Sequence, residues 1–405
     1  MLHIQNFWKS RLDTNHDNRF ECCGCSACEN SCAEHAISMS YDNEGFLYPK
    51  VDEDKCIGCG RCIKVCPISN SPHERDYLHT YAGYSNESTV IDNCASGGVC
   101  TAISRYVIEK GGIVFGVRYS DDFIRSEYAK AETLSELKQF MTSKYVQSEK
   151  NSIFINIRDE IKKGRFILFI GCPCDVSALK LFMGREYENL FTCELVCMGV
   201  TSFKVADEYF TPRTKKWGKL TGLNSKGKKY GWFVPCLEES YSNGKIVSKP
   251  YFGTYYGYGF TKFQRPSCAK CPYRGKLGRG DIRMGDFWGI QKSDEFWNER
   301  GVSCIFTRTE KGQQLLSALE ERNFSLYEVP YEKAAINNNM DLDKNYGEKQ
   351  WKVRQKFADM LLTKGLVAAC RKTATWEFWI KHYVPPVFAN ALKHLRHAIT
   401  DKKTD

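Results

Sequence analysis

The spacing of apolar and polar residues changes character along the chain. Between residues 77 and 210, short apolar runs alternate with amphipathic stretches, a pattern typical of α/β units around a largely parallel sheet. The unbroken apolar run at 166–170, FILFI, predicts a central strand that is covered on both faces. Residues 217–263 are rich in aromatic residues and glycine and show little helical period, so we expect strands and loops there.

Several element boundaries can also be predicted. The stretch VCTAISRYVIEK ends at a Gly-Gly pair and predicts a helix over 99–110, and IVFGVRY then predicts a strand over 113–119. Thr133 and Glu136 have the spacing of a capping box. In the tail, apolar residues recur in steps of three and four over 376–399, and the Pro-Pro pair at 385–386 divides this stretch into two predicted helices.

The cysteine content points to metal chemistry, because 20 of the 405 residues are cysteine. The first residues, MLHIQNFWKS, lack the basic and apolar regions of a secretory signal. No window approaches the roughly 18 apolar residues that spanning a bilayer requires. We therefore expect a cytoplasmic protein whose closely spaced cysteines are metal or redox ligands rather than disulfide partners.

Eight of the cysteines form two copies of one spacing, C-x2-C-x2-C-x3-C. In such a pair, three thiolates of each copy bind one 4Fe-4S cluster, and the fourth cysteine reaches the other cluster. We assign one cluster to Cys22, Cys25, Cys28 and Cys66, and the second to Cys56, Cys59, Cys62 and Cys32. Two zinc sites of four thiolates each are the alternative. Cys23 is an extra thiol beside a ligand, and the alternating stretch between the copies, ISMSYDNEGFLYPKV, predicts a hairpin.

These patterns divide the chain into four segments. We expect an N-terminal extension over 1–19, a two-cluster module over 20–70, an α/β domain over 77–335 with parts at 77–165 and 166–335, and a basic helical tail over 340–405. The polar segment at 70–76, NSPHERD, is the expected linker. The predicted class is α+β, with a two-cluster ferredoxin-like module, an α/β domain with a mixed sheet and a helical C-terminal tail.

An ordered set of strings resembles the family of coenzyme F420 hydrogenase/dehydrogenase beta subunits, in the branch with a two-cluster ferredoxin module fused in front. The strings are ASGGVCTAI (95–103), SKYVQS (143–148), GCPCDVSALK (171–180), LVCMGV (195–200), SKGKKYGW (225–232) and RPSCAKCPYRGKLGRGDIRMGDFWGI (265–290). The resemblance implies that residues 77–335 bind FAD and pass electrons between the flavin and iron–sulfur clusters. Similar proteins are encoded among polysaccharide-biosynthesis functions.

The resemblance places a flavin site on two of these strings. Its predicted residues are Ser96, Gly97, Gly98, Thr101, Ser143, Lys144 and Tyr145. A Gly-Gly pair at a helix start offers free N–H groups and the positive end of the helix dipole, which suit a pyrophosphate. Lys144 could neutralise a phosphate or lie near the flavin ring. A packing turn at the glycines and a surface lysine at 144 are the alternatives.

The resemblance also places a third 4Fe-4S cluster at Cys174, Cys197, Cys268 and Cys271. The last two form C-x2-C, and the first two each follow a strand-like run, where ligands of α/β sheets gather. Cys172 is an alternative to Cys174 as a ligand. A structural zinc site and unliganded thiols are the other interpretations of the same four residues.

No catalytic acid or base is assigned. Asp175 and Met198 stand where the family often has glutamine and histidine. Asp286, in GDFWG, is the best-placed carboxylate for chemistry at the site, and a turn-forming role is the alternative.

Two functions are consistent with these residues. In the first, clusters feed FAD in an anaerobic setting, and the flavin reduces a small organic or glycan-type substrate, with ferredoxin or another redox protein as donor. In the second, the chain is an electron-transfer subunit of a partner dehydrogenase or hydrogenase and has no substrate of its own. The net charge of +10 is spread out and no nucleic-acid module accompanies it, so we expect no nucleic-acid binding.

The basic tail allows two interpretations. It carries the aromatic cluster Trp376, Phe378 and Trp379 on a broad apolar stripe. The stripe predicts either helices that cap the main domain or peripheral contact with an anionic membrane on its cytoplasmic face.

Overall fold

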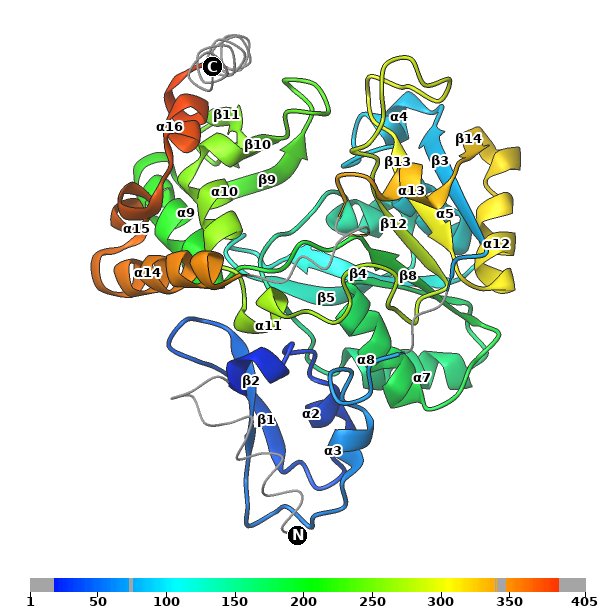
Figure 1. Ribbon diagram of the computed structural model, residues 1–405. Coiled ribbons are helices and arrows are strands. Elements are labelled where there is room, and N and C mark those ends of the chain that lie inside the picture. The colour runs from blue at the N-terminus through cyan, green and yellow to red at the C-terminus, as the bar shows by residue number, and fades with distance from the viewer. Residues whose placement is uncertain (1–17, 73–75, 339, 341–346, 386–405) are drawn as a thin grey trace, which may run out of the picture.

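The computed structural model describes residues 18–72, 76–338, 340 and 347–385 (Figure 1). Its N-terminal module, residues 18–72, contains η1 (Asn18–Glu21), α2 (Ala27–Ser31), β1 (Ile37–Tyr41), β2 (Leu47–Val51) and α3 (Arg61–Lys64). β1 and β2 pair antiparallel, with Ile37 opposite Val51, which confirms the predicted hairpin. The turn is closed by the Asp42 carboxylate, which accepts a hydrogen bond from the Phe46 amide at 2.8 Å.

A nine-stranded mixed sheet forms the centre of the molecule. Its strands are β3 (His79–Ser85), β4 (Ile113–Tyr119), β5 (Ser126–Ala131), β6 (Ser148–Glu149), β7 (Ile167–Gly171), β8 (Leu190–Leu195), β12 (Ile282–Asp286), β13 (Ser303–Thr307) and β14 (Phe324–Glu328). Their order is β14-β3-β13-β12-β8-β7-β4-β5-β6. The expectation of a largely parallel sheet holds for the centre, where β4, β7, β8 and β12 run parallel, and for the short edge pair of β5 and β6. The edge formed by β13, β3 and β14 is antiparallel.

Helices cover both faces of this sheet. They are α4 (Ser88–Ile91), α5 (Val99–Glu109), α6 (Leu134–Leu137), η2 (Lys138–Phe140), α7 (Ile153–Lys162), α8 (Pro173–Met183), α12 (Glu310–Ser317), η4 (Glu320–Arg322) and α13 (Tyr331–Ala335). One hydrophobic cluster joins α5 and α12 to the sheet, and another joins α7 and α8 to it. Every residue of β7 is buried between these layers, as its apolar run predicts. The capping box at Thr133 and Glu136 is also confirmed, as is the helix that begins at residue 99.

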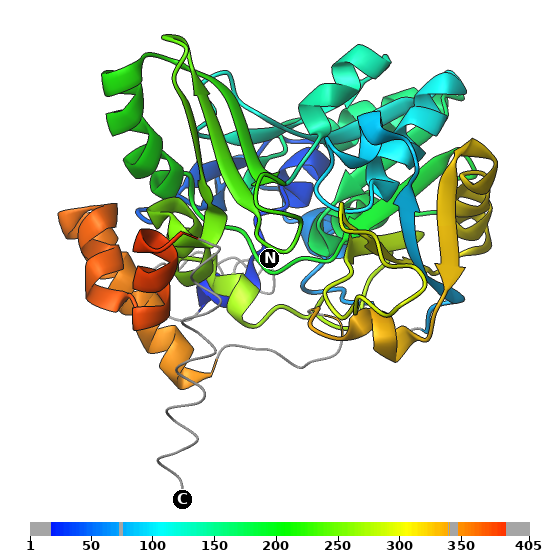
Figure 2. The ribbon, with the colours of Figure 1, turned by 90° about the horizontal axis from the view of Figure 1, so that it is seen from above.

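A second, smaller unit lies beside the sheet. It consists of α9 (Phe203–Trp217), β9 (Leu220–Gly227), β10 (Cys236–Tyr241), β11 (Ile246–Pro250), η3 (Tyr251–Gly253), α10 (Tyr255–Lys262), α11 (Pro266–Ala269), α14 (Glu348–Lys364), α15 (Leu366–Thr373) and α16 (Trp376–Tyr383). Its three strands form an antiparallel sheet of order β11-β10-β9. Seen from above, α14 to α16 and β14 lie at opposite sides of the molecule (Figure 2).

The described part of the tail packs against this unit. Phe357, Leu361, Leu366 and Phe378 are buried in one cluster with α9 and α10. Three helices occupy 347–385, and the second half of the predicted pair, beyond the prolines, lies outside the described residues. Within the described ranges, no helix combines the length and the apolar character that crossing a membrane demands.

The N-terminal module shares its hydrophobic cores with the rest of the chain. Phe46 and Tyr48 of the hairpin belong to the cluster that also contains α9, α10 and α14. Ala27 and Val65 belong to the cluster beneath α7 and α8. Figure 1 shows the module against the underside of both units, next to α8 and α11. The module is therefore held in a fixed position, which matters for any transfer between its cysteines and the sheet domain.

Candidate functional site

Four cysteines of the module surround one cavity, and we call them the inner quartet: Cys22, Cys25, Cys28 and Cys66. Positive φ angles at Gly24 and Ser26, +69° and +59°, turn the loop between the first three so that their thiols face the same space. Burial raises the pKa of Cys28, and the neighbouring thiols Cys22 and Cys66 raise it further. Several thiolates in such a site need positive charge beside them, so the cavity suits an iron–sulfur cluster.

The other four predicted ligands form the outer quartet: Cys32, Cys56, Cys59 and Cys62. Cys59 is exposed, and Ile57 beside it has 65 % of its surface in solvent. The Cys32 thiol accepts a hydrogen bond from the Ala36 amide at 3.3 Å. Cys62 also lines the cavity of the inner quartet, so the two quartets adjoin. Among the described residues, no three side chains of Cys, His, Asp or Glu stand close enough to hold one metal ion.

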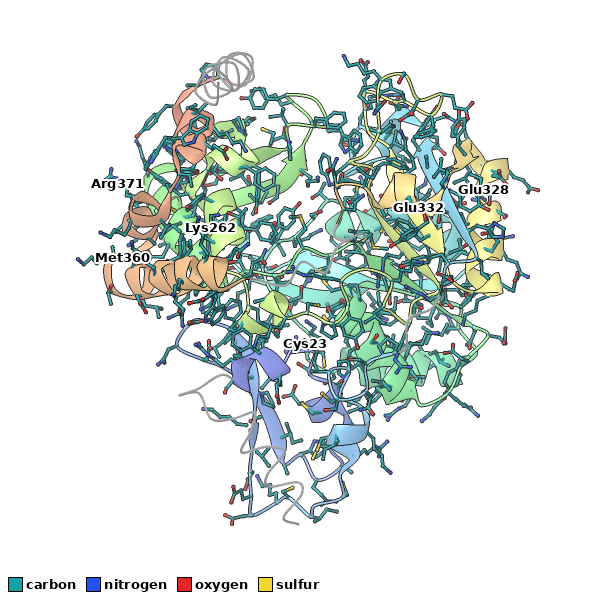
Figure 3. The ribbon with its side chains drawn as sticks, viewed as in Figure 1. Cys23, Lys262, Glu328, Glu332, Met360 and Arg371 are labelled. Carbon is teal, nitrogen blue, oxygen red and sulfur yellow. The ribbon has the colours of Figure 1, made fainter. Side chains whose placement is uncertain are left out.

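Six further thiols gather where the module meets the sheet domain, and we call them the junction thiols: Cys23, Cys172, Cys174, Cys197, Cys268 and Cys271. The Cys172 and Cys197 sulfurs are 3.7 Å apart. The thiol of Cys23 hydrogen-bonds with those of Cys174 and Cys25. Figure 3 shows Cys23 between the module and the sheet. The four residues predicted for a third cluster thus lie together, and Cys23 connects them to the inner quartet.

Sheet topology explains why these thiols meet. β7, β8 and β12 are parallel neighbours, and Cys172, Cys197 and Asp286 stand at or just beyond their carboxyl ends. Loops after parallel strands converge at this edge of a sheet, which is where open α/β sheets bind ligands. α8 begins at Pro173, so Cys174 lies in its first turn. The C-x2-C pair arrives from the other side, on and after α11.

The predicted Ser96 loop is partly occupied by packing. The Ser96 hydroxyl donates to the Val302 carbonyl at 2.8 Å, and the Gly97 amide donates to the Ser303 hydroxyl at 3.1 Å. A Cβ on Gly97 would lie 2.3 Å from the Gly83 carbonyl oxygen, so only glycine fits. These contacts support the packing-turn alternative for the first two residues. α5 nevertheless begins at Val99 with Gly98 as an N-cap that offers no side chain, and Thr101 is buried in its first turn.

The second predicted flavin string lies close to this helix start. The Lys144 ammonium donates to the carbonyls of Met141 and Thr142 at 2.7 and 3.3 Å, and it interacts electrostatically with Cys100 in the first turn of α5. Burial lowers the pKa of Lys144 to about 7. No ion pair with a carboxylate is present for this lysine in the described ranges, so it is suited to an anionic ligand.

Tyr145 connects Lys144 to Asp286, the carboxylate that the sequence singles out, and to its partner Lys226, which the sequence does not indicate. Its ring packs on Phe260 at 4.4 Å, and its hydroxyl lies in the field of Lys226, Asp286 and Cys197. Lys226 is buried and pairs with Asp286 at 3.0 Å. The position of Tyr145 thus links the candidate flavin residues to the junction thiols. Ser143 neighbours it in the same loop.

Asp286 is held by side chains rather than by a turn. Its second oxygen accepts from the Trp232 indole at 2.9 Å. Trp288 stacks on Trp232 with ring centroids 5.5 Å apart, and the Lys226 ammonium lies 4.8 Å from the Trp288 ring centroid. The strings SKGKKYGW and GDFWGI carry these residues, but no spacing rule indicates that they meet. The site-chemistry interpretation of Asp286 therefore has geometric support.

The two departures from the family pattern occupy different surroundings. Asp175 is buried, pairs with Lys150 at 3.2 Å and accepts from the Tyr128 hydroxyl at 3.1 Å. Burial raises the pKa of Asp175. Met198 has 53 % of its surface exposed. Asp175 thus forms a buried ion pair beside Cys172 and Cys174, whereas Met198 faces solvent.

The affinity of the Lys144 site for an anionic ligand, for which FAD is the predicted one, is expected to depend on pH. The folded pKa of about 7 lies below the ordinary lysine value of 10.5, so the free lysine is neutral at pH 9 and must take up a proton to pair with a phosphate. Burial raises the pKa of nearby Cys100 to about 11 and of Tyr119 to about 12, so neither titrates in this interval. The affinity for FAD, measured by fluorescence titration, should fall by up to about tenfold per pH unit above pH 7. Lys144→Met should bind more weakly and without this slope; an unchanged slope would place the phosphate elsewhere.

Comparison with known proteins agrees with both halves of the chain. Residues 164–331 match the family model for the C terminus of the coenzyme F420 hydrogenase/dehydrogenase beta subunit. Residues 21–70 and 48–103 match models described as 4Fe-4S dicluster domains. The first match contains five of the junction thiols, and the second contains both quartets.

Individual relatives are distant. A subunit of the F(420)H(2) dehydrogenase of Methanosarcina mazei is 24 % identical over 313 residues, which cover 74 % of this chain and 82 % of the relative. Coenzyme F420-dependent sulfite reductase of Methanocaldococcus jannaschii is 25 % identical over 152 residues, or 35 % of this chain and 23 % of the relative. A chain of the F420-reducing hydrogenase complex of Methanosarcina barkeri aligns with a TM-score of 0.44 at 17 % identity, covering 74 % of this chain and 92 % of that one.

Proposed function

The chain carries 4Fe-4S dicluster domains ahead of a C-terminal domain of the coenzyme F420 hydrogenase/dehydrogenase beta subunit, and from this premise we propose that it passes electrons between a docked redox protein and bound FAD. The observation that carries the proposal is the position of Cys23, whose thiol meets Cys25 of the inner quartet and Cys174 of the sheet domain. On the other side of the junction thiols, Tyr145 lies within electrostatic reach of Cys197, Lys226 and Asp286.

The residues that would hold the cofactors follow from this geometry. The inner and outer quartets would each hold one 4Fe-4S cluster, and Cys174, Cys197, Cys268 and Cys271 would hold a third. Clusters supply one-electron transfer, and FAD supplies the exchange between one-electron and two-electron steps. Lys144 and the uncapped start of α5 would bind the anionic part of FAD, with Tyr145 near its ring.

The protein side chains have separate tasks in this transfer. The exposed loop at Ile57 and Cys59 offers the surface at which a ferredoxin-type donor can dock. The buried cores around the inner quartet and the junction thiols exclude water and hold the donor and acceptor sites at fixed separation. Lys226 and Asp286, held by Trp232, place a fixed charge pair at the far end of the path.

Two destinations for the electrons are proposed. The relative from Methanosarcina mazei is named as part of a dehydrogenase, which favours an electron-transfer subunit serving a partner enzyme. Reduction of a small organic or glycan-type substrate is the second candidate. It is favoured by the aromatic ring of Phe233, which stacks on Trp297 and contacts Trp288 at a tilt. Phe233 has 45 % of its surface exposed, and sugar rings stack on such faces.

Cofactor analysis of the anaerobically purified protein tests the proposal. We expect a brown protein with about twelve irons, an equal amount of acid-labile sulfide and about one FAD per chain. Zinc in place of iron, or a chain that binds no flavin, would contradict it.

A further inference from the structure

Arg265 is a buried arginine at the boundary between the N-terminal module and the rest of the chain. Only 1 % of its surface is exposed. Its Nε donates to the Cys22 carbonyl at 2.8 Å, and its Nη1 donates to the Gln147 side-chain oxygen at 3.1 Å. The guanidinium lies 4.1 Å from the centroid of the Tyr48 ring. Its charge therefore stands directly against the first cysteine of the inner quartet.

The charge of Arg265 lacks the partner that the other buried arginines have. Arg283 and Arg308 pair with the Glu194 carboxylate at 2.7 and 3.1 Å, and Arg354 pairs with Glu44. For Arg265, no carboxylate forms an ion pair in the parts of the chain that are described. A buried cation without a counter-charge is strongly unfavourable, so an anion is expected beside it.

The groups around Arg265 indicate which anion this is. The titratable side chains with the strongest electrostatic interaction with its guanidinium are Tyr48, Cys22, Cys23 and Cys268. Its Nη2 is buried without a hydrogen-bond partner, as is the amide nitrogen of Gln147 next to it. A Cβ on Gly24 would lie 2.3 Å from that nitrogen and 2.9 Å from Arg265 Nη1. Both donors therefore lie in close contact with the backbone of the cysteine loop. Cluster sulfurs accept such N–H donors.

We propose that the counter-charge of Arg265 is the 4Fe-4S cluster of the inner quartet, and that Arg265 raises the reduction potential of this cluster above that of the outer cluster. The proposal rests on the inner and outer clusters, two of the three named under the proposed function. Reduction adds one negative charge to a cluster, and a buried cation beside it stabilises that charge in a low-dielectric site. Cys59 of the outer quartet is exposed, whereas Cys25 of the inner quartet is buried, so solvent screens charge more strongly at the outer cluster. Electrons that enter at the surface would therefore move inward downhill.

Potentials of the full-length protein, titrated anaerobically and followed by electron paramagnetic resonance, test this role. Arg265→Gln removes the charge and keeps donors, and Arg265→Lys keeps the charge. In the glutamine variant we expect the equilibrium constant for reduction of the inner cluster to fall at least tenfold. For one electron this makes its potential about 59 mV more negative. The lysine variant should shift less. The outer-cluster signal, assigned by its loss in Cys59→Ser, should stay in place as the internal reference.

A second variant protects the test against a loop that fails to assemble. Gln147→Glu retains an oxygen for the Leu47 amide and for Arg265, which the wild-type side chain binds at 3.0 and 3.1 Å, and adds a negative charge to the guanidinium. It should lower the inner potential as Arg265→Gln does. An unchanged inner potential in an iron-loaded variant would overturn the proposal. Loss of the inner cluster from both variants would also overturn it, because Arg265 would then only hold the loop. A wild-type chain without clusters would instead refute the proposed function.

Discussion

Replacing Cys268 and Cys271 together by serine is expected to remove about four of about twelve irons and to disconnect the flavin from the module. Both thiols belong to the junction thiols. Cys271 interacts electrostatically with Cys197 and Cys23, and Cys268 interacts with Cys197. Flavin reduction by reduced ferredoxin should slow by more than the roughly 10–100-fold that indirect changes cost at metal sites. Direct chemical reduction of the flavin should still proceed, since the candidate FAD residues are elsewhere.

The control for this variant is Cys370→Ser. Cys370 is buried with Phe357 and Phe378 in the core of the tail, and its thiol lies 3.8 Å from the Tyr255 carbonyl oxygen. It belongs neither to the two quartets nor to the junction thiols. The Cys370→Ser variant should have the iron content of the wild type and the same rate of flavin reduction by ferredoxin. If the double serine variant keeps all its iron and its rate, the third cluster is absent and the junction thiols are structural.

Arg354→Met is expected to give the largest loss of stability. Arg354 is 1 % exposed on α14, and its guanidinium donates to both oxygens of Glu44 in the hairpin turn and to the Gln264 carbonyl at 3.1 Å. Burial alone would raise the pKa of Glu44, but Arg354 and Arg19 outweigh it and hold the pKa below its ordinary value. Removing Arg354 leaves the buried Glu44 with Arg19 alone, which is 3.0 Å away and partly exposed, so the loss approaches the roughly 3–5 kcal/mol of a broken buried pair.

Hydrogen exchange of the β1–β2 hairpin measures this loss where it acts. In Arg354→Met the hairpin amides should exchange roughly 100-fold faster or more, because each 1.4 kcal/mol is about tenfold in the opening equilibrium. The matched control is Lys352→Met on the same helix, whose pair with Glu348 is exposed and should be worth at most about 1 kcal/mol. The pair requires an ionised Glu44, so its contribution should also disappear as the pH falls through the lowered pKa of that carboxyl. Equal exchange rates in the two variants would show that the hairpin is held by its apolar core alone.

Local signals account for what the sequence predicted correctly. The hairpin, the capping box and the buried strand β7 each depend on residues within a few positions of one another. The crossover assignment of the quartets stays a prediction for the ligands themselves, but Cys22, Cys25, Cys28 and Cys66 do line one cavity. The relative order of strands beyond the centre was not predictable, because β3 pairs with strands more than 200 positions later.

The residues that were missed act across long separations. Glu44 and Arg354 are 310 positions apart, and Arg265 meets Cys22 across 243. Periodicity indicates that a position is buried, but it does not say which distant charge will stand beside it. The aromatic cluster of the tail illustrates the same limit, since Phe378 enters the core while Trp376 keeps 38 % of its surface exposed. That packing favours the capping interpretation of the tail over membrane contact.

In the proposed function, electrons reach FAD only through the outer quartet, the inner quartet and the junction thiols. Rapid mixing of the anaerobic protein with reduced ferredoxin, followed by cluster and flavin absorbance, tests it most directly. We predict that the clusters are reduced first and the flavin afterwards. We also predict that Cys59→Ser, at the exposed outer quartet, slows both phases. Flavin reduced by ferredoxin while the clusters remain oxidised, or at an unchanged rate in Cys59→Ser, would contradict the account.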